Sequence, residues 1–264
     1  MNPDFTTVCG VDAKHLKQLS WVWPTWKRHK PSLLNSPMLI FRDREQIRSD
    51  DEVRAVVDHP NLTIVPWPIG DVSYIGTKGD KWTDPQRYCM LAGFVYIPAL
   101  FVATPYWLKL DTDTVATGQD VWIDSEWFKD NPAIVSHPWS FTKPADQMQV
   151  MDRWVAENPN EFNPWFLDRP PLNLIPKPGA SRISHPRIIS WAAFFSTGFT
   201  IRSANSAAWI CGNYHLPIPS QDGYLWYLAK RAGLEIVRIG MKKRGWKHRS
   251  SEKGIKEAIE EAMK

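Results

Sequence analysis

Apolar runs and amphipathic stretches alternate along the first part of the chain in the order expected of strands and helices. Apolar runs at residues 6–11, 37–41, 61–65 and 107–110 predict four strands. The stretches between them predict helices that open over residues 12–18, cover residues 43–57 and begin near Asp84. The strands are continuously apolar, which is typical of a mostly parallel sheet with helices on both faces. The predicted fold class is therefore α/β.

The pattern is less regular in the second part. Apolar segments at residues 132–136, 188–201 and 234–239 predict further regular structure, and helices are expected at residues 145–157, 204–211, 223–232 and 251–264. A long Pro- and Asn-rich segment, residues 158–186, lies between the helix expected at 145–157 and the apolar segment at 188–201. With no internal repeat or low-complexity segment, we expect one domain, with halves at 1–117 and 118–250 and a charged C-terminal helix at 251–264.

Composition narrows the classes of function. With 43% hydrophobic residues the chain can bury a core, and its formal net charge is only +4. The basic run at residues 238–249 suits the phosphates of a nucleotide, of nucleic acid or of lipid headgroups, or is a solvated tail. Because this run is short and the remaining charges balance, a nucleic-acid-binding protein is the least favoured class.

Cysteine usage and the N-terminus predict the compartment. The three cysteines are far apart and lack CxxC spacing, which argues against a disulfide framework or a zinc cluster and suits a reducing compartment. Neither a signal peptide nor a confident membrane span is evident. We therefore expect a cytoplasmic protein, with peripheral membrane contact possible through the basic run.

The tryptophan content is high, at fifteen residues. Indole faces pack well against sugar rings, so clusters such as Trp21, Trp23 and Trp26 weakly favour a carbohydrate ligand. For any single tryptophan, burial in the core is the more frequent outcome.

Two carboxylates follow the fourth apolar run directly, at Asp111 and Asp113. In a continuing strand, residues at i and i+2 share a face, and these carboxylates would repel each other. At the carboxyl end of a parallel strand they lie where such sheets bind ligands, and they can hold a divalent cation against phosphates. The motif therefore predicts a metal–diphosphate site.

These residues, in this order, resemble the nucleotide-sugar glycosyltransferases of the GT-A fold. In that family an α/β nucleotide-binding half ends in a DxD motif, here Asp111-Thr112-Asp113, and an acceptor-binding half follows. The resemblance extends to the hydrophobic segment with a Ser/Gly turn at 195–199, to the acid at the predicted helix start, Asp222, and to a C-terminal histidine, His248.

The resemblance implies a set of metal and donor residues. Asp111, Asp113 and His248 would hold Mn²⁺ or Mg²⁺, and the imidazole favours Mn²⁺. Donor binding would involve Thr112 and Asp12, and Lys243 and Lys247 would belong to a cationic lid over the diphosphate with Lys242 and Arg244. Arg87 is a further donor-binding candidate. Three of these residues also have a simpler interpretation: His248 as a tail histidine, Asp12 as a helix cap and Arg87 as a surface residue.

The catalytic and acceptor residues come from the same resemblance. Asp222 would deprotonate an acceptor hydroxyl or contact the acceptor, and the alternative is that it only caps its helix. Gly198 and Trp191 would line the acceptor side. Inversion or retention of configuration stays open.

Other families share parts of this pattern. A hydrophobic strand followed by DxDxT/V also resembles the first motif of haloacid-dehalogenase-like phosphatases, with Asp111 as the nucleophile. That family places the motif near the start of the chain and needs a later acidic pair that is not found here. A nucleotidyltransferase and a catalytically inactive GT-A-like binding protein are further alternatives. The favoured prediction is a metal-dependent transferase, hexosyl-transferring by type, that uses a nucleoside-diphosphate sugar, usually a uridine diphosphate sugar, and a saccharide or other hydroxyl acceptor.

Overall fold

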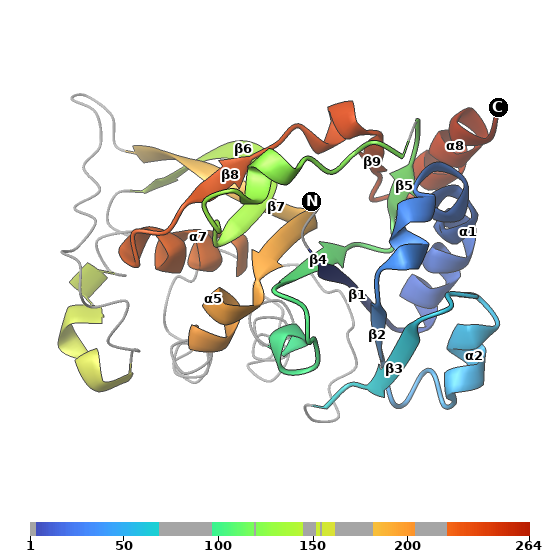
Figure 1. Ribbon diagram of the computed structural model, residues 1–264, viewed down its shortest axis with the longest axis horizontal. Coiled ribbons are helices and arrows are strands. Elements are labelled where there is room, and N and C mark those ends of the chain that lie inside the picture. The colour runs from blue at the N-terminus through green and yellow to red at the C-terminus, as the bar shows by residue number, and fades with distance from the viewer. Residues whose placement is uncertain are drawn as a thin grey trace.

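The protein is built on one mixed sheet (Figure 1). The computed structural model describes residues 4–68, 97–118, 120–144, 152–153, 155–161, 182–203 and 221–264. Within these ranges a seven-stranded sheet has the order β3-β2-β1-β4-β7-β6-β8. Its strands are β1 (Phe5–Val11), β2 (Met38–Arg42), β3 (Leu62–Pro66), β4 (Tyr106–Leu110), β6 (Ile134–Pro144), β7 (Arg182–Ser196) and β8 (Ile236–Arg238).

Parallel pairing dominates this sheet. The pairs β1–β2, β2–β3, β1–β4 and β6–β8 are parallel, whereas β7 runs antiparallel to both β4 and β6. The carboxyl ends of β1, β2, β3 and β4 therefore lie along one edge. The prediction of a mostly parallel α/β sheet is confirmed, and β7 is the strand that makes it mixed.

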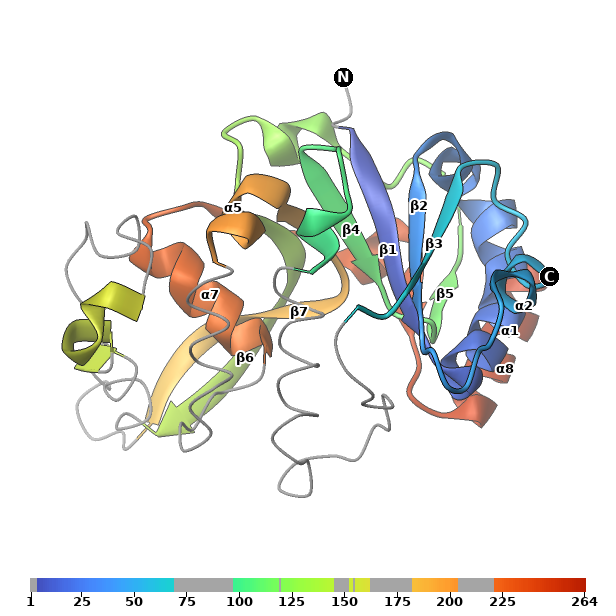
Figure 2. The same ribbon diagram turned by 90° about the horizontal axis from the view of Figure 1, so that it is seen from below.

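Helices pack on the sheet in two groups. The α-helices whose bounds the structure describes are α1 (Ala13–His29), α2 (Asp50–Arg54), α5 (Thr197–Arg202), α7 (Gln221–Arg231) and α8 (Glu252–Met263). Figures 1 and 2 show α1 and α8 side by side at the β1–β3 end of the sheet, with α5 and α7 beside β7. On β4, Leu108 and Leu110 belong to the core cluster with α1, whereas the Trp107 indole donates a hydrogen bond to Thr200 of α5. The two faces of β4 are thus covered by different helices.

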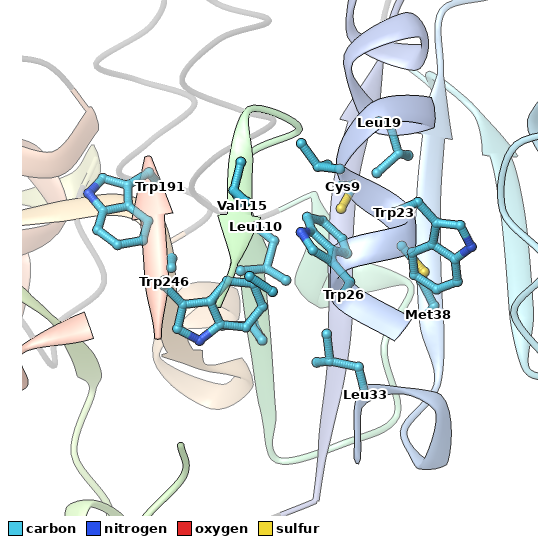
Figure 3. Close-up of a cluster of buried hydrophobic side chains, with 14 of the residues drawn as sticks. Cys9, Leu19, Trp23, Trp26, Leu33, Met38, Leu110, Val115, Trp191 and Trp246 are labelled. Atoms are coloured by element: carbon cyan, nitrogen blue, oxygen red, sulfur yellow. The ribbon is translucent and has the colours of Figure 1, made fainter. Parts of the chain in front are cut away.

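The core is rich in aromatic rings. Figure 3 shows Trp26 of α1 and Trp246 of the C-terminal region in one cluster with Leu110 and Val115. The two indoles meet edge to face, with ring centroids 6.1 Å apart. Most tryptophans whose side chains are described are buried, which favours the structural interpretation of the tryptophan content. The side chains of Trp139, Trp154 and Trp165 lie outside the described set.

A second, two-stranded sheet joins the middle of the chain to its end. Strand β5 (Thr114–Ala116), directly after the acidic motif, pairs antiparallel with β9 (Trp246–His248). In this register Thr114 lies opposite His248. The small sheet therefore carries the C-terminal histidine to the acidic motif.

Several predicted elements have different limits in the structure. The helix expected at 43–57 is wrong for its first part, since α2 covers only Asp50–Arg54. Asp43 instead accepts hydrogen bonds from the backbone of Glu45 and Gln46 and closes a turn, and a capping box of Ser49 and Glu52 then starts the short helix.

The apolar segment 188–201 divides into two elements, because Ser196 ends β7 and accepts a hydrogen bond from the Phe199 backbone as the N-cap of α5. The helices expected near Asp84 and at 204–211, and part of the one at 145–157, fall outside the described residues. Within the described ranges, no helix combines the length and the apolar character needed to cross a bilayer.

Candidate metal and donor site

The acidic motif lies where the fold places ligand-binding residues, at the carboxyl end of β4. Asp111 follows the strand, and its backbone N–H donates to the Trp191 carbonyl of β7, 2.9 Å away. The Thr114 N–H then donates to the Asp111 carbonyl, so the chain turns at the motif before β5 begins. This turn removes the two carboxylates from the regular strand, in which they would have shared a face.

Helix α1 fixes the position of the segment that contains the motif. Thr112 donates to the Gln18 side chain, and Trp26 donates through Nε1 to the Thr114 carbonyl at 2.6 Å. The Ala116 N–H donates to Thr25 Oγ1. These α1 residues recur at helical spacing and so share one face of the helix. The motif is thus held by polar bonds within a buried region.

Three potential metal ligands meet at this turn. The ligating atoms of Asp111, Asp113 and His248 all lie within 4.8 Å of one another. His248 Nε2 is 3.2 Å from Asp113 Oδ1, and the Arg249 N–H donates to the Asp113 carbonyl. The β5–β9 pairing sets this arrangement, because it aligns residues that are far apart in sequence.

The donor atoms fit a divalent cation. Asp113 Oδ1 is buried and lacks a well-aligned hydrogen bond even though His248 Nε2 is close to it. A buried carboxylate oxygen without such a bond is costly, and a cation would satisfy it. Two carboxylates and one imidazole form a set that suits Mn²⁺ better than Mg²⁺, which prefers oxygen ligands alone.

His248 is also shaped by its neighbours. Its ring stacks on Trp191 with centroids 5.7 Å apart and planes 17° apart. Burial lowers the pKa of His248, but the interaction with Asp113 and the negative charge of Asp111 raise that pKa by more, so the net shift is upward from 6.5. An imidazole that ligates a metal must first lose this proton.

A pocket of about 200 Å³ opens beside the motif. It lies at the carboxyl ends of the first four sheet strands, which is the usual ligand position in such sheets. The described residues that line it are Val8, Gly10, Val11, His15, Phe41, Asp43, Trp67, Pro98, Trp107, Lys109, Leu110, Asp111, Thr112 and Asp113. A ligand bound in this pocket would lie beside any metal ion held by the three residues.

Among the expected donor residues, Thr112 lines this pocket, although its hydroxyl bonds to Gln18. Asp12 caps α1 and accepts hydrogen bonds from the His15 backbone at 2.8 Å and from His15 Nδ1 at 2.7 Å. Burial raises the pKa of Asp12, but these bonds lower it by more, and the net shift is downward. Of this pair, His15 rather than Asp12 lines the pocket.

The basic residues of the expected lid have other partners. Lys247 pairs with Glu261 of α8 at 2.7 Å, on a strand whose alternation turns it away from His248. Arg244 lies over the Trp127 ring and pairs with Asp124. Lys243 is exposed in the 3₁₀ turn Met241–Arg244. The structure therefore does not bring Lys247 or Arg244 to the pocket, and Arg87 lies outside the described residues.

The expected acceptor residues are separated in space. Trp191 adjoins the triad, but the residue is only 5% exposed and its ring packs against His248. Gly198 lies at the other edge of the sheet, because antiparallel pairing puts Ser196 opposite Tyr106 at the start of β4. From Tyr106 to Asp111 the chain advances by five residue steps, or roughly 17 Å. Asp222 is the second residue of α7, and its side chain is outside the described set.

Sequence reasoning missed several pocket residues. Asp43 and Trp67 follow β2 and β3, and His15 lies in the first turn of α1 after β1. The signal was available, since residues just after successive parallel strands converge at one edge. Lys109 was also missed; it lies within the fourth strand and forms an ion pair with Asp111.

Solved structures share this architecture. The mannosyltransferase Ktr4p from S. cerevisiae superposes with a TM-score of 0.58 at 11% identity, covering 93% of this chain and 70% of the other. The Mn/GDP form of core-mannan synthase A from Aspergillus fumigatus gives 0.55 at 13% identity, with 93% and 74% covered.

The chain has a GT-A-like fold. The 4-diphosphocytidyl-2C-methyl-D-erythritol synthase from Anaerococcus prevotii also matches, with a TM-score of 0.52 at 9% identity over 99% of both chains. No protein-family model and no curated protein sequence matches the chain. At these identities the likeness establishes the fold, and the triad and pocket must support the chemistry.

Proposed function

We propose that this protein is a metal-dependent glycosyltransferase that moves a sugar, by type a hexose, from a nucleoside-diphosphate donor to a saccharide or other hydroxyl acceptor. The observation that carries the proposal is the meeting of Asp111, Asp113 and His248 beside a pocket at the carboxyl edge of a GT-A-like sheet. The Mn/GDP form of one structural neighbour supports the choice of a nucleoside diphosphate and of Mn²⁺.

In this proposal, separate residues bind the metal, position the motif and contact the acceptor. Asp111, Asp113 and His248 would hold Mn²⁺, or Mg²⁺ less well, and the bound metal would neutralise charge on the departing diphosphate. Helix α1 and Trp191 keep the motif and the imidazole in place. Asp222 stays the proposed base or acceptor contact, at the start of α7. A cytoplasmic site of action remains part of the proposal.

The first experiment is calorimetric titration with uridine and guanosine diphosphates, with and without Mn²⁺. We expect metal-dependent binding of one of them, and loss of that binding in the Asp111→Ala/Asp113→Ala double variant. Uridine diphosphate is tested because the sequence favoured it. Guanosine diphosphate is tested because core-mannan synthase A, a structural neighbour, is known in an Mn/GDP form. If neither nucleotide binds under any condition, the proposal is wrong.

Nucleotidyl transfer is the second candidate, because the fold of a diphosphocytidyl-erythritol synthase covers this chain almost completely. The two reactions differ in what leaves. Glycosyl transfer releases a nucleoside diphosphate from a nucleotide sugar, whereas nucleotidyl transfer releases pyrophosphate from a nucleoside triphosphate. Assaying both products with Mn²⁺ distinguishes them. The GT-A-like fold argues against the haloacid-dehalogenase alternative, which requires a different fold.

A further inference from the structure

Strand β4 contains a charged residue that its position does not explain. Its other members, Tyr106, Trp107, Leu108 and Leu110, are aromatic or aliphatic, yet Lys109 is only 6% exposed. Burying an ammonium costs several kcal/mol unless partners compensate. An aliphatic residue would suit a strand at this depth.

The neighbours of Lys109 leave space on the pocket side. Across the sheet it lies opposite Val8 on β1 and Ala193 on β7, both smaller than lysine. Its side chain lines the pocket together with Trp107, which shares its face of β4, and with Asp111, which follows the strand. Its Nζ forms an ion pair with Asp111 Oδ1.

The charges around the pocket show why a cation matters here. The described lining residues contribute three carboxylates, Asp43, Asp111 and Asp113, and Lys109 is the one lysine or arginine among them. A nucleoside diphosphate is itself an anion and would be repelled by this set. A metal ion at the triad offsets part of the repulsion, and Lys109 is the fixed positive charge already in place.

We propose that Lys109 is a donor-positioning residue with two opposed effects: it supplies positive charge to the donor diphosphate, and it competes with the metal for Asp111. This inference rests on the proposed function and assigns a role within the same site. A metal held by Asp111 would weaken the ion pair between Asp111 and Lys109, and a diphosphate in the pocket would then gain attraction from the same ammonium. Binding of metal and of diphosphate is thereby coupled through one side chain.

A merely structural Lys109, which only neutralises Asp111, makes a different prediction. Removing it would then free Asp111 for the metal without weakening the diphosphate. The proposed role requires opposite changes, because the same ammonium that hinders the metal attracts the anion.

The test compares Lys109→Met, which removes the charge at similar length, with Lys109→Arg, which keeps it. Lys253→Met is the matched control, since Lys253 is an exposed α8 residue outside the described lining of the pocket, and its replacement also removes one positive charge. Calorimetry at fixed ionic strength measures Mn²⁺ alone, and then uridine and guanosine diphosphates at saturating Mn²⁺.

For Lys109→Met we expect Mn²⁺ affinity to rise severalfold and diphosphate affinity to fall about tenfold or more, as one charge-assisted contact is lost. Lys109→Arg should restore most of the diphosphate affinity, and Lys253→Met should match the unmodified protein. Thermal unfolding checks that each variant is folded, with Lys109→Gln as the substitute if the methionine variant is not.

Unchanged diphosphate affinity in Lys109→Met, or parallel weakening of both ligands, would overturn the inference. Its failure is distinguishable from failure of the proposed function. If the unmodified protein binds no nucleoside diphosphate with Mn²⁺, the function itself is wrong. If it binds one and Lys109→Met binds it equally well, only the role of Lys109 is wrong.

Discussion

At the scale of single residues, the surroundings of His248 separate a metal ligand from an ordinary surface histidine. The ring is stacked on Trp191 and directed at Asp113, so its orientation is set before any ligand binds. Preorganisation of this kind lowers the entropy lost on metal binding. The interpretation of His248 as a solvated tail residue does not agree with these contacts.

We expect His248→Ala to weaken Mn²⁺ binding at least tenfold, because one of three protein ligands is lost. His29→Ala is a suitable control. His29 is the last residue of α1, and its ring hydrogen-bonds to the backbone carbonyls of Gly118 and Ala262 and not to the triad. Calorimetric titration of Mn²⁺ measures both. Equal affinity in His248→Ala and the unmodified protein would exclude His248 from the metal site.

The Mn²⁺ affinity should also depend on pH in a defined direction. The pKa of His248 is raised above 6.5, so the imidazole stays protonated to higher pH, and the proton competes with the metal. Affinity should therefore increase as the pH rises through the raised pKa. In the metal-free protein, the His248–Asp113 pair stabilises the fold fully below pH 6.5, and this contribution is lost as the pH rises through the same pKa.

Titrations with Mn²⁺ at several pH values between about 6 and 8 check this prediction. The His248→Ala variant should lose most of the pH dependence, because it lacks the titrating ligand. A steep dependence that persists in the variant would assign the proton to another group.

At the scale of elements, the site depends on the antiparallel pairing of β5 with β9. Gly245 directly precedes β9. Its φ is +78°, in the left-handed region, and a Cβ there would clash with the Thr117 carbonyl oxygen. The Thr117 N–H donates to the Gly245 carbonyl at 2.7 Å, so the two backbones approach closely. A glycine at this point is thus a condition for placing His248.

We expect Gly245→Ala to lower the free energy of unfolding by about 2 kcal/mol or more, and to weaken Mn²⁺ binding by displacing β9. Gly198→Ala is the matched control: a Cβ on this exposed α5 residue meets no atom within 4 Å. That change should be neutral or slightly stabilising, because alanine favours helix. Chemical denaturation and Mn²⁺ titration measure both variants, and equal stability of the two would contradict the role given to Gly245.

At the scale of the whole molecule, the site joins parts of the chain that are distant in sequence. Helix α1, the segment after β4, β7 and the C-terminal β9–α8 region all contribute contacts around the triad. Ligands that bind this junction should therefore stabilise the folded chain as a unit. Stabilisation follows from binding the native state and not the unfolded one.

Mn²⁺ with its nucleoside diphosphate, at about a hundred times the dissociation constant, should add about 2.7 kcal/mol of stability. For a chain of this size that corresponds to a rise in Tm of roughly 5 to 10 °C. Asp113→Asn, which keeps the shape of the side chain but not its charge, should lose most of the rise. Thermal unfolding with and without both ligands measures it, and an equal rise in the variant would place the ligands elsewhere.

The sequence by itself determined the approximate positions of the first four sheet strands along the chain, and it placed Asp111 and Asp113 directly after the fourth. Continuous apolar runs define buried parallel strands, and carboxylates after such a strand must lie at its ligand-binding end. The same reasoning could not separate a turn from a helix at Asp43, because Asp side chains close turns and cap helices with the same hydrogen bonds.

Only the tertiary structure decided which distant residues reach the motif. The β5–β9 register brings in His248 and turns Lys247 toward Glu261, and the antiparallel direction of β7 carries Gly198 to the opposite edge. Register and strand direction arise from long-range packing, and a shift of one residue or a reversal moves every side chain. The pairing of Lys109 with Asp111 in the pocket could not be predicted from the sequence either, since a strand pattern shows a polar residue but not what its side chain contacts.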